Sequence, residues 1–173
     1  LRHLLKDVAP EVPSILVFTR TKHGADKVVK DLVNNGITAQ AIHGNKSQSA
    51  RQNALGNFKN RTTRVLVATD IAARGIDIPL IDHVIHYAFP PSAKLFIHRS
   101  GRAARAGRIG YCWGIVDPEE MPYMVDLHVF LGRKLSTGQN QESETNDDDD
   151  VGEKRNEDLP PDKVQNDTIE EIT

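Results

Sequence analysis

Short apolar runs recur along the first two thirds of the chain, and each is bounded by polar or turn-forming residues. The runs are rich in β-branched residues and are too short for a typical helix. Most are continuous rather than alternating, which predicts strands buried on both faces, as in a parallel sheet. They span Ile15–Phe18, Ala39–Ile42, Val65–Ala68, Val84–Tyr87 and Cys112–Val116.

Helical patterns lie between and after these runs. Ser47 and Ser92 can act as N-caps, and Asp117 followed by Pro118 is a helix-start signal. Because strands and helices alternate, the sequence predicts an α/β domain with right-handed crossovers, in which helices cover both faces of a parallel sheet. The predicted helices span His23–Val33, Gln48–Phe58, Ala93–Arg105 and Glu119–Leu131.

The apolar pattern stops after about Leu135. Ser, Asn, Gln and Glu then dominate, and Asp147–Asp150 is a run of four aspartates. Such a segment cannot bury enough apolar surface to offset the entropy of ordering its backbone. We therefore expect residues 1–135 to form the folded domain and residues 136–173 to form a disordered acidic tail. The sequence shows no internal repeat.

Charge is segregated between these two parts, although the whole chain has a net charge of only −2. Residues 1–135 carry 19 Lys and Arg against 11 Asp and Glu, a net of +8. Residues 136–173 carry 3 against 13, a net of −10. A basic body with an acidic tail indicates a polyanionic partner for the body.

Several classes of protein are disfavoured by composition. Cys112 is the only cysteine, so no internal disulfide forms, and its apolar neighbours favour a buried core residue over a reactive thiol. The seven histidines are scattered, so no metal site is expected. No apolar run is long enough to span a bilayer, and no signal peptide is present, so we expect an intracellular protein and no membrane partner. Because the chain begins with Leu1 rather than Met, we expect a piece of a longer protein.

Polar clusters follow four of the predicted strands. In an open α/β sheet, ligands collect beyond the carboxyl ends of the strands. Glycine lets the backbone approach a phosphate, and a helix N-terminus offers free N–H groups to it. Ordinary turn chemistry explains one such cluster, whereas four at one edge favour a binding site. The clusters are Thr19–Lys22, His43–Arg51, Thr69–Asp77 and Phe89–Ser92.

Three arginines and a histidine are concentrated between His98 and Arg105. If this segment is helical, His98, Arg102 and Arg105 fall at i, i+4 and i+7 on one face, and Arg99 lies off that stripe. Guanidinium groups at fixed spacing suit a polyphosphate, because each planar fork grips phosphate oxygens bidentately. A solvated basic face is the alternative interpretation. Gly107 could end the helix.

Four motifs, in this order and spacing, resemble the C-terminal RecA-like domain of DEAD-box RNA helicases. The resemblance covers about residues 1–135 and therefore implies a RecA-like parallel sheet. The motifs are Val17–Thr21; His43-Gly44 with Gln48 and Arg51; Ala68–Asp70 with Ala73–Ile78; and His98-Arg99 with Arg102 and Arg105.

The resemblance implies a role for each matching position. Arg102 and Arg105 match arginines that reach the γ-phosphate of ATP, with Arg105 as the arginine finger, and His98 matches a residue that couples two domains. Asp77 matches the acid that contacts the ATP ribose, and Gly75 would line the same cofactor site. RNA-backbone contacts, which do not read sequence, would involve Thr19, Arg20, Gly44, Gln48, Arg51, Thr69, Asp70 and Arg74.

The chain contains neither a Gly-x-x-x-x-Gly-Lys-Ser/Thr phosphate loop nor an Asp-Glu-Ala-Asp motif. In the family both lie on the N-terminal RecA-like domain of the same protein, which would hold most of the ATP and its Mg²⁺. The implied function is the second motor domain of an ATP-dependent RNA helicase, acting on single-stranded RNA and inactive when alone. A non-catalytic nucleic-acid-binding module and a DNA-directed superfamily 2 motor domain are the alternatives.

One departure from the family pattern is Ala103-Ala104, where the family usually has Thr-Gly. Alanine favours helix, so the arginine spacing is expected to survive. Together with Lys94–His98 and Asp126–Arg133, this variant resembles a nucleolar branch involved in large-ribosomal-subunit assembly. That branch implies ribosome-assembly proteins as partners and a nuclear or nucleolar location. Residues 15–78 look more like the generic or bacterial form of the family, which would imply a cytoplasmic location.

Overall fold

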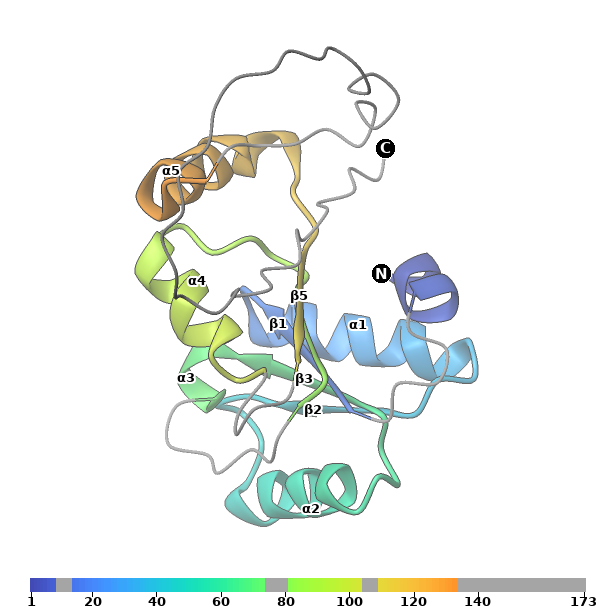
Figure 1. Cartoon of the computed structure of the whole chain (residues 1–173). Helices are drawn as coiled ribbons and strands as arrows, with labels where there is room; N and C mark the ends of the chain where they lie inside the picture. Colours follow the sequence, from blue (N-terminus) through green and yellow to red (C-terminus); the bar gives the residue numbers. More distant parts are fainter. Residues whose placement is uncertain (9–13, 74–80, 104–108, 134–173) are drawn as a thin grey trace, which may run out of the picture. The chain divides into compact units, whose positions relative to one another are not determined.

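The computed structural model describes residues 1–8, 14–73, 81–103 and 109–133, all of them within one compact unit, Leu1–Arg133. The predicted disordered tail, residues 136–173, lies outside the described residues, so the tail and the boundary at 135 stay predictions. The described part is built on one parallel sheet of five strands in the order β2-β3-β1-β4-β5 (Figure 1).

All five predicted strands are present, within one or two residues of the expected bounds. The central strand β1 is buried at every position, as its continuous apolar run predicted. Its neighbours β3 and β4 both pair with it in parallel. The strands are β1 (Ile15–Thr19), β2 (Ala39–Ile42), β3 (Val65–Thr69), β4 (His83–His86) and β5 (Tyr111–Gly114).

Four predicted helices are also present, and two predicted N-caps are confirmed. Ser47 Oγ accepts from Ala50 N at 3.2 Å, and Ser92 Oγ accepts from Leu95 N at 3.4 Å. The sequence did not predict α3 (Asp70–Ala73) or a π-helical turn, η1 (Leu4–Val8), because neither is long enough to show a helical period. The other elements are α1 (Lys22–Asn34), α2 (Gln48–Lys59), α4 (Ala93–Ser100), a 3₁₀ turn η2 (Pro118–Glu120) and α5 (Met121–Leu131).

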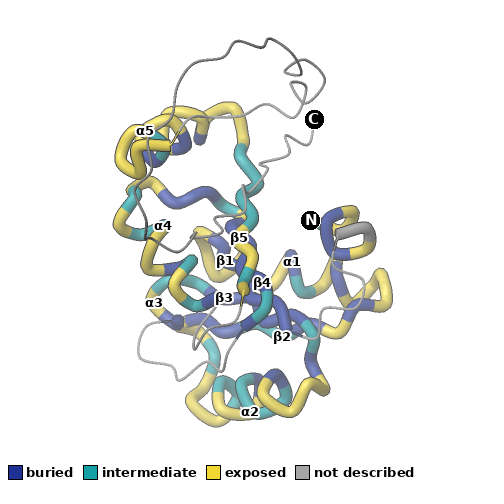
Figure 2. Tube along the Cα trace, in the orientation of Figure 1, coloured by how far each residue is buried: buried dark blue, intermediate teal, exposed yellow. Residues whose placement is uncertain are grey.

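Helices lie on both faces of the sheet, as predicted. Alternate residues of β1 point to opposite faces. Ile15 and Val17 pack with α1 and η1, whereas Leu16 and Phe18 pack with α2 and α3. Figure 2 shows the buried strands between these more exposed helices. Both faces of the sheet are therefore core, which explains why the strand runs are continuously apolar.

The helix predicted over Ala93–Arg105 ends earlier, at Ser100. Gly101 N donates to Ile97 O at 2.8 Å, and Ala103 leaves the helix to form an isolated parallel bridge with Ile81. Ala103 is buried in the core between the sheet and α2. Burying this residue against the sheet outweighs the helix propensity of two alanines, which is a weak preference. The prediction that Arg102 lies within the helix is therefore wrong, and Arg105 lies outside the described residues.

Among the described residues, no helix is both long enough and apolar enough to cross a membrane.

Candidate functional site

The carboxyl ends of four strands lie at one edge of the sheet, as the sequence predicted. In the parallel register Thr19 lies beside Thr69, Phe18 beside His86, and Ile42 beside Ala68. The loops after β1, β2, β3 and β4 therefore leave the sheet at the same level. Arg74, Gly75 and Asp77 of the β3 loop lie outside the described residues, so their predicted roles stay predictions.

The β1 loop carries two residues that the sequence assigned to RNA, Thr19 and Arg20, and they differ in solvent exposure. Thr19 is buried, and its Oγ1 donates to the Thr21 carbonyl at 3.3 Å, so its side chain supports the turn before α1. Thr21 caps α1 by accepting from Gly24 N at 3.0 Å. Arg20 is exposed at the surface, where its Nη2 lies 2.6 Å from Glu120 Oε1. Of the two predicted contacts, only Arg20 presents its side chain to solvent.

Glu120 is a buried carboxylate that the sequence did not predict as a site residue. Its Oε2 accepts from the backbone N–H of Phe89 at 3.2 Å and of Asp117 at 3.3 Å, while Oε1 accepts from Arg20. These three donors compensate the cost of burying the charge. The available sequence signal was the capping pattern, because Glu120 stands three residues after the N-cap Asp117.

The β2 loop is held to α1 by a buried histidine. His43 Nε2 lies 3.1 Å from Asp26 Oδ1, and Lys46 Nζ lies 3.2 Å from the same oxygen. The hydrogen bond from His43 is the main cause of a lowered pKa for Asp26, and Lys46 lowers it further. This cluster holds the loop that carries Gly44 and leads to Ser47, the N-cap of α2.

Gln48 and Arg51 lie in the first turn of α2, which follows that loop. Gln48 is exposed and Arg51 is half-buried. Arg51 Nε is buried and has no hydrogen-bond partner among the described residues. Both side chains therefore lie at the predicted edge, next to Gly44 in sequence, and neither is part of the hydrophobic core.

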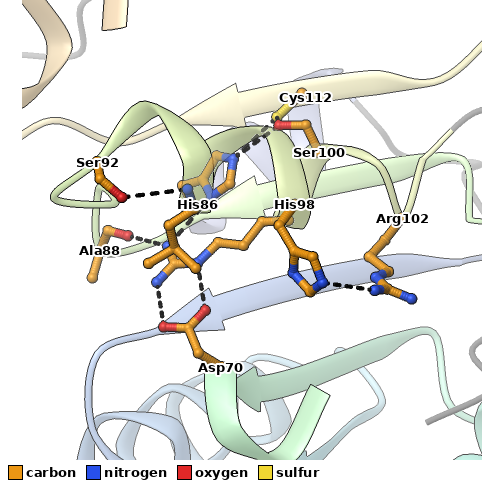
Figure 3. A network of polar contacts seen from close by, with 10 residues as sticks. Asp70, His86, Ala88, Ser92, His98, Ser100, Arg102 and Cys112 are labelled. Atoms are coloured by element: carbon orange, nitrogen blue, oxygen red, sulfur yellow. Dashed lines mark hydrogen bonds and ion pairs between the residues drawn. The ribbon is translucent and has the colours of Figure 1, made fainter. Parts of the chain in front are cut away.

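A buried arginine connects the β3 loop to α4. Arg99 Nε lies 2.7 Å from Asp70 Oδ1 and Nη2 lies 2.8 Å from Oδ2, which is a bidentate pair (Figure 3). Arg99 Nη1 also donates to the Ala88 carbonyl at 2.9 Å, and the guanidinium lies 5.1 Å from the centre of the Phe18 ring. The sequence placed Arg99 off the basic stripe; the structure shows that it points into the protein.

Asp70 was predicted to contact RNA, but its carboxylate is occupied by Arg99. Both carboxylate oxygens accept from the guanidinium, and the Asp70 side chain is 26% exposed. The pair ties the first residue of α3 to the last turn of α4. Asp70 therefore positions these two elements in this structure, and direct RNA contact by this residue stays a prediction.

His86, at the end of β4, lies beside this pair and is uncharged. Burial and, to a lesser extent, the positive charge of Arg99 together lower its pKa to about 3, against a smaller opposite effect of Asp70. A guanidinium only donates, so His86 Nδ1 accepts from Arg99 Nη1 at 3.4 Å and Nε2 carries the proton. Nε2 then faces Ser100 Oγ at 3.4 Å and Cys112 Sγ at 3.2 Å.

Cys112 was expected to be a buried core residue, and this prediction is wrong. The residue is exposed because β5 is the last strand of the sheet and has a neighbour on one side only.

The outward side of the arginine segment carries His98 and Arg102. Arg102 Nη2 lies 3.2 Å from His98 Nε2, so these residues contact each other although Arg102 follows the helix. Figure 3 shows the two side chains in contact. His98 is exposed and Arg102 is half-buried. His98 Nε2 accepts from Arg102 in this contact, and the Arg102 guanidinium, which has no carboxylate partner among the described residues, suits an anion rather than a metal ion. Among the described residues, no group of three potential metal ligands occurs.

Comparison with known proteins agrees with this arrangement. Residues 1–107 match the family described as helicase conserved C-terminal domain. The sequence is 44% identical over 136 residues to the ATP-dependent RNA helicase DDX54 of Mus musculus, covering 79% of this chain and 16% of that protein. It is 48% identical over 128 residues to the ATP-dependent RNA helicase DBP10 of Yarrowia lipolytica, covering 74% and 14%.

Solved structures show the same fold. The DEAD-box protein SrmB of E. coli superposes with a TM-score of 0.70 at 35% identity, covering 74% of each chain. A DEAD-box protein from Methanococcus jannaschii gives a TM-score of 0.69 at 35% identity, covering 76% of this chain and 36% of that one. The five-stranded parallel sheet is therefore a RecA-like domain.

The chain belongs to the helicase C-terminal domain family of DEAD-box RNA helicases, which confirms the family predicted from the four motifs. The relatives cited above are named ATP-dependent RNA helicases, and the chain spans about one sixth or less of their length.

Proposed function

We propose that this chain is the second motor domain of an ATP-dependent RNA helicase. In this function it supplies arginines to the ATP phosphates and part of the surface that binds single-stranded RNA. The single observation that carries the proposal is the ion pair between Arg99 and Asp70. Asp70 lies at the sheet edge proposed for RNA, and Arg99 lies in α4, the helix that precedes the arginines proposed for ATP. A shift at either place would be transmitted through this buried, bidentate contact.

ATP with Mg²⁺ is the proposed cofactor, held mainly by an N-terminal RecA-like domain of the same protein. Arg102 fits the phosphate part of the ligand, because it is half-buried beside the exposed His98 and has no carboxylate partner among the described residues. Arg102 and Arg105 would stabilise negative charge on the transferring phosphoryl group, with Arg105 as the finger. Asp77 and Gly75 would contact the nucleoside. Mg²⁺ would neutralise phosphate charge from the other domain.

RNA would be bound along the edge formed by the β1 and β2 loops. Arg20 and Gln48 are exposed there, Arg51 is half-buried, and Lys22 Nζ reaches Asn45 Oδ1 at 3.2 Å across the two loops. Cationic and amide side chains of this kind contact phosphates and sugars, and such contacts hold a strand without reading its bases. Gly44, Thr69 and Arg74 complete the proposed surface.

The experiment joins this chain to an N-terminal RecA-like domain and compares two substitutions. Arg105→Ala is expected to nearly abolish RNA-stimulated ATP hydrolysis and to spare most RNA binding, because a finger acts mainly in the transition state. Arg105→Lys should not rescue hydrolysis, since an ammonium lacks the planar fork. Arg51→Ala should weaken RNA affinity first. Hydrolysis is measured at saturating RNA, and affinity with a non-hydrolysable ATP analogue.

Lys94→Ala is the matched control, because it removes one positive charge from the exposed side of α4 outside the proposed site. Hydrolysis by Arg105→Ala within about twofold of the parent would refute the catalytic role and favour a non-catalytic nucleic-acid-binding module. Equal stimulation of the parent by RNA and by DNA of the same sequence would instead favour a DNA-directed motor.

Similarity to the DDX54 and DBP10 helicases supports the branch that the sequence pointed to. A nucleolar location and ribosome-assembly partners are proposals of the same kind. Imaging of the tagged full-length protein, with and without active ribosome synthesis, tests both.

A further inference from the structure

Helix α5 is apolar around nearly its whole circumference, although much of it is exposed. Met124 and Leu127 pack into a small core with Phe89, on the side that faces α4. Much of the remaining surface of α5 is exposed (Figure 2). Its exposed apolar side chains include Val129, which is 77% exposed, and Phe130, which is 64% exposed. A helix in contact with water usually has a polar outer face, so an apolar outer face indicates that something covers it.

A pocket of about 300 Å³ opens at the N-terminal end of this helix. Two tyrosines, Tyr87 and Tyr123, and two acidic residues, Asp117 and Glu119, line it on this side, and the β1 loop, Thr19 to Thr21, lines it on the other. Glu120 also lines the pocket, but Arg20 neutralises it at 2.6 Å. The lining therefore has a surplus of two negative charges, on a body whose overall charge is positive.

The pocket and the exposed face of α5 are continuous. Tyr123 lines the pocket, and Phe130 lies seven residues, or two turns, further along the same side of the helix. Asp126 is exposed between them and is the only acidic residue within α5. The surface thus combines apolar side chains with three exposed carboxylates, Asp117, Glu119 and Asp126.

A surface with carboxylates and apolar side chains fits a polypeptide segment that carries both basic and apolar residues. Arg and Lys pair with carboxylates and lie favourably over tyrosine rings, and apolar side chains cover an apolar helix face. The acidic segment 136–173 of this chain has the wrong charge, because its net of −10 would be repelled. Two further carboxylates, Asp117 and Glu119, also make the α5 side of the pocket unfavourable for a nucleic acid strand, whereas the opposite wall is the β1 loop proposed for RNA.

We propose that the pocket and α5 form a docking surface for a basic, apolar segment of a partner protein. The segment places an arginine or lysine between Tyr87, Tyr123 and the carboxylates of Asp117 and Glu119. Its aliphatic or aromatic residues then cover Phe130 and Val129. The pocket shares Thr19 and Arg20 with the edge proposed for RNA but is separate from the residues assigned to ATP, and the proposal does not depend on the catalytic role of the domain.

The test selects a library of random 12-residue peptides on the 173-residue chain. The selected peptides are expected to combine Arg or Lys with aliphatic or aromatic residues. The most enriched peptide is then titrated against the parent, Glu119→Lys and Phe130→Asp. Each substitution should weaken its affinity about tenfold or more, as for the central residues of an interface. Val33→Asp is the matched control, because it also places a charge on an exposed apolar position of a helix, here α1, and should change affinity less than about twofold.

Glu119 and Phe130 are exposed, so both variants should unfold at the same temperature as the parent. The peptide affinity of each variant tests the proposal independently of the other. No enrichment above uncoated wells, peptides without basic residues, or equal affinity for all variants would overturn the proposal. Displacement of the peptide by oligouridine would assign the surface to RNA instead. Self-association of the chain that Phe130→Asp abolishes would assign it to a second copy.

Discussion

Replacing Arg99 with methionine is expected to destabilise the domain by about 3 kcal/mol, because breaking a buried ion pair strands the remaining charge. The Arg99 side chain is 3% exposed and makes two charged hydrogen bonds to Asp70 and one to the Ala88 carbonyl. Each charged hydrogen bond contributes roughly 1.5–3 kcal/mol. We take the lower end of the range of about 3–5 kcal/mol for a broken pair, since Asp70 is 26% exposed and its carboxylate regains some hydration.

The measurement is urea unfolding of the chain, followed by far-ultraviolet circular dichroism. With a slope of about 1–3 kcal/mol per molar urea, the midpoint should fall by about 1–3 M. The double variant Arg99→Met with Asp70→Leu should recover most of this loss, because no unpaired charge remains. Arg102→Met, on the exposed side of the same segment, is the control and should change the free energy of unfolding by less than about 0.5 kcal/mol.

Two results would contradict this prediction. A loss of less than about 1 kcal/mol in Arg99→Met would mean that the pair contributes little, as surface pairs do. A double variant less stable than the sum of the two single losses would mean that packing of the aliphatic stem, rather than charge, dominates at this position.

Three further predictions concern pH, the tail and catalysis. The pKa of His86 is about 3 in the folded protein, below the ordinary value of 6.5, so stability should fall as pH drops below about 6.5, by at most about 1.4 kcal/mol per pH unit. Urea midpoints between pH 7 and 4 should fall less steeply for His86→Gln, and equal slopes would count against the assignment. Cutting the chain after Leu135 should leave the urea midpoint unchanged and strengthen binding to single-stranded RNA, most at low salt; loss of cooperative unfolding would show that the tail is structural. The 173-residue chain alone should hydrolyse no ATP, since it lacks the phosphate loop and the acidic magnesium motif; turnover like that of a complete helicase would contradict the two-domain proposal.

The strands, most of the helices and the family could be predicted from local patterns in the sequence. Apolar runs such as Ile15–Phe18 predicted buried strands because every residue of a doubly covered strand must be apolar. Ser47 and Ser92 were recognised as caps because their hydroxyls accept from N–H groups three residues ahead. These signals are local, so neighbouring residues are sufficient to read them.

The end of α4 and the direction of Arg99 were decided by the tertiary structure. Local propensity favours helix through Ala103, but pairing with Ile81 and burial against the sheet end the helix at Ser100. Arg99 points inward because the carboxylate of Asp70, which lies 29 residues earlier in the chain, accepts from its guanidinium with both oxygens. Helical spacing shows which residues share a face, but not which charge lies beneath it.

The ion pair between Arg20 and Glu120 is a second feature that depends on the tertiary structure, because the two residues are 100 positions apart in the sequence. Each follows a different strand or turn, and only the parallel order β1-β4-β5 brings the β1 loop close to the turn before α5. A buried carboxylate is stable only where donors from several segments converge on it. Donors from distant segments are brought together only when the chain packs into its tertiary structure. Strand burial and helix capping depend on neighbouring residues, so they can be predicted from the sequence.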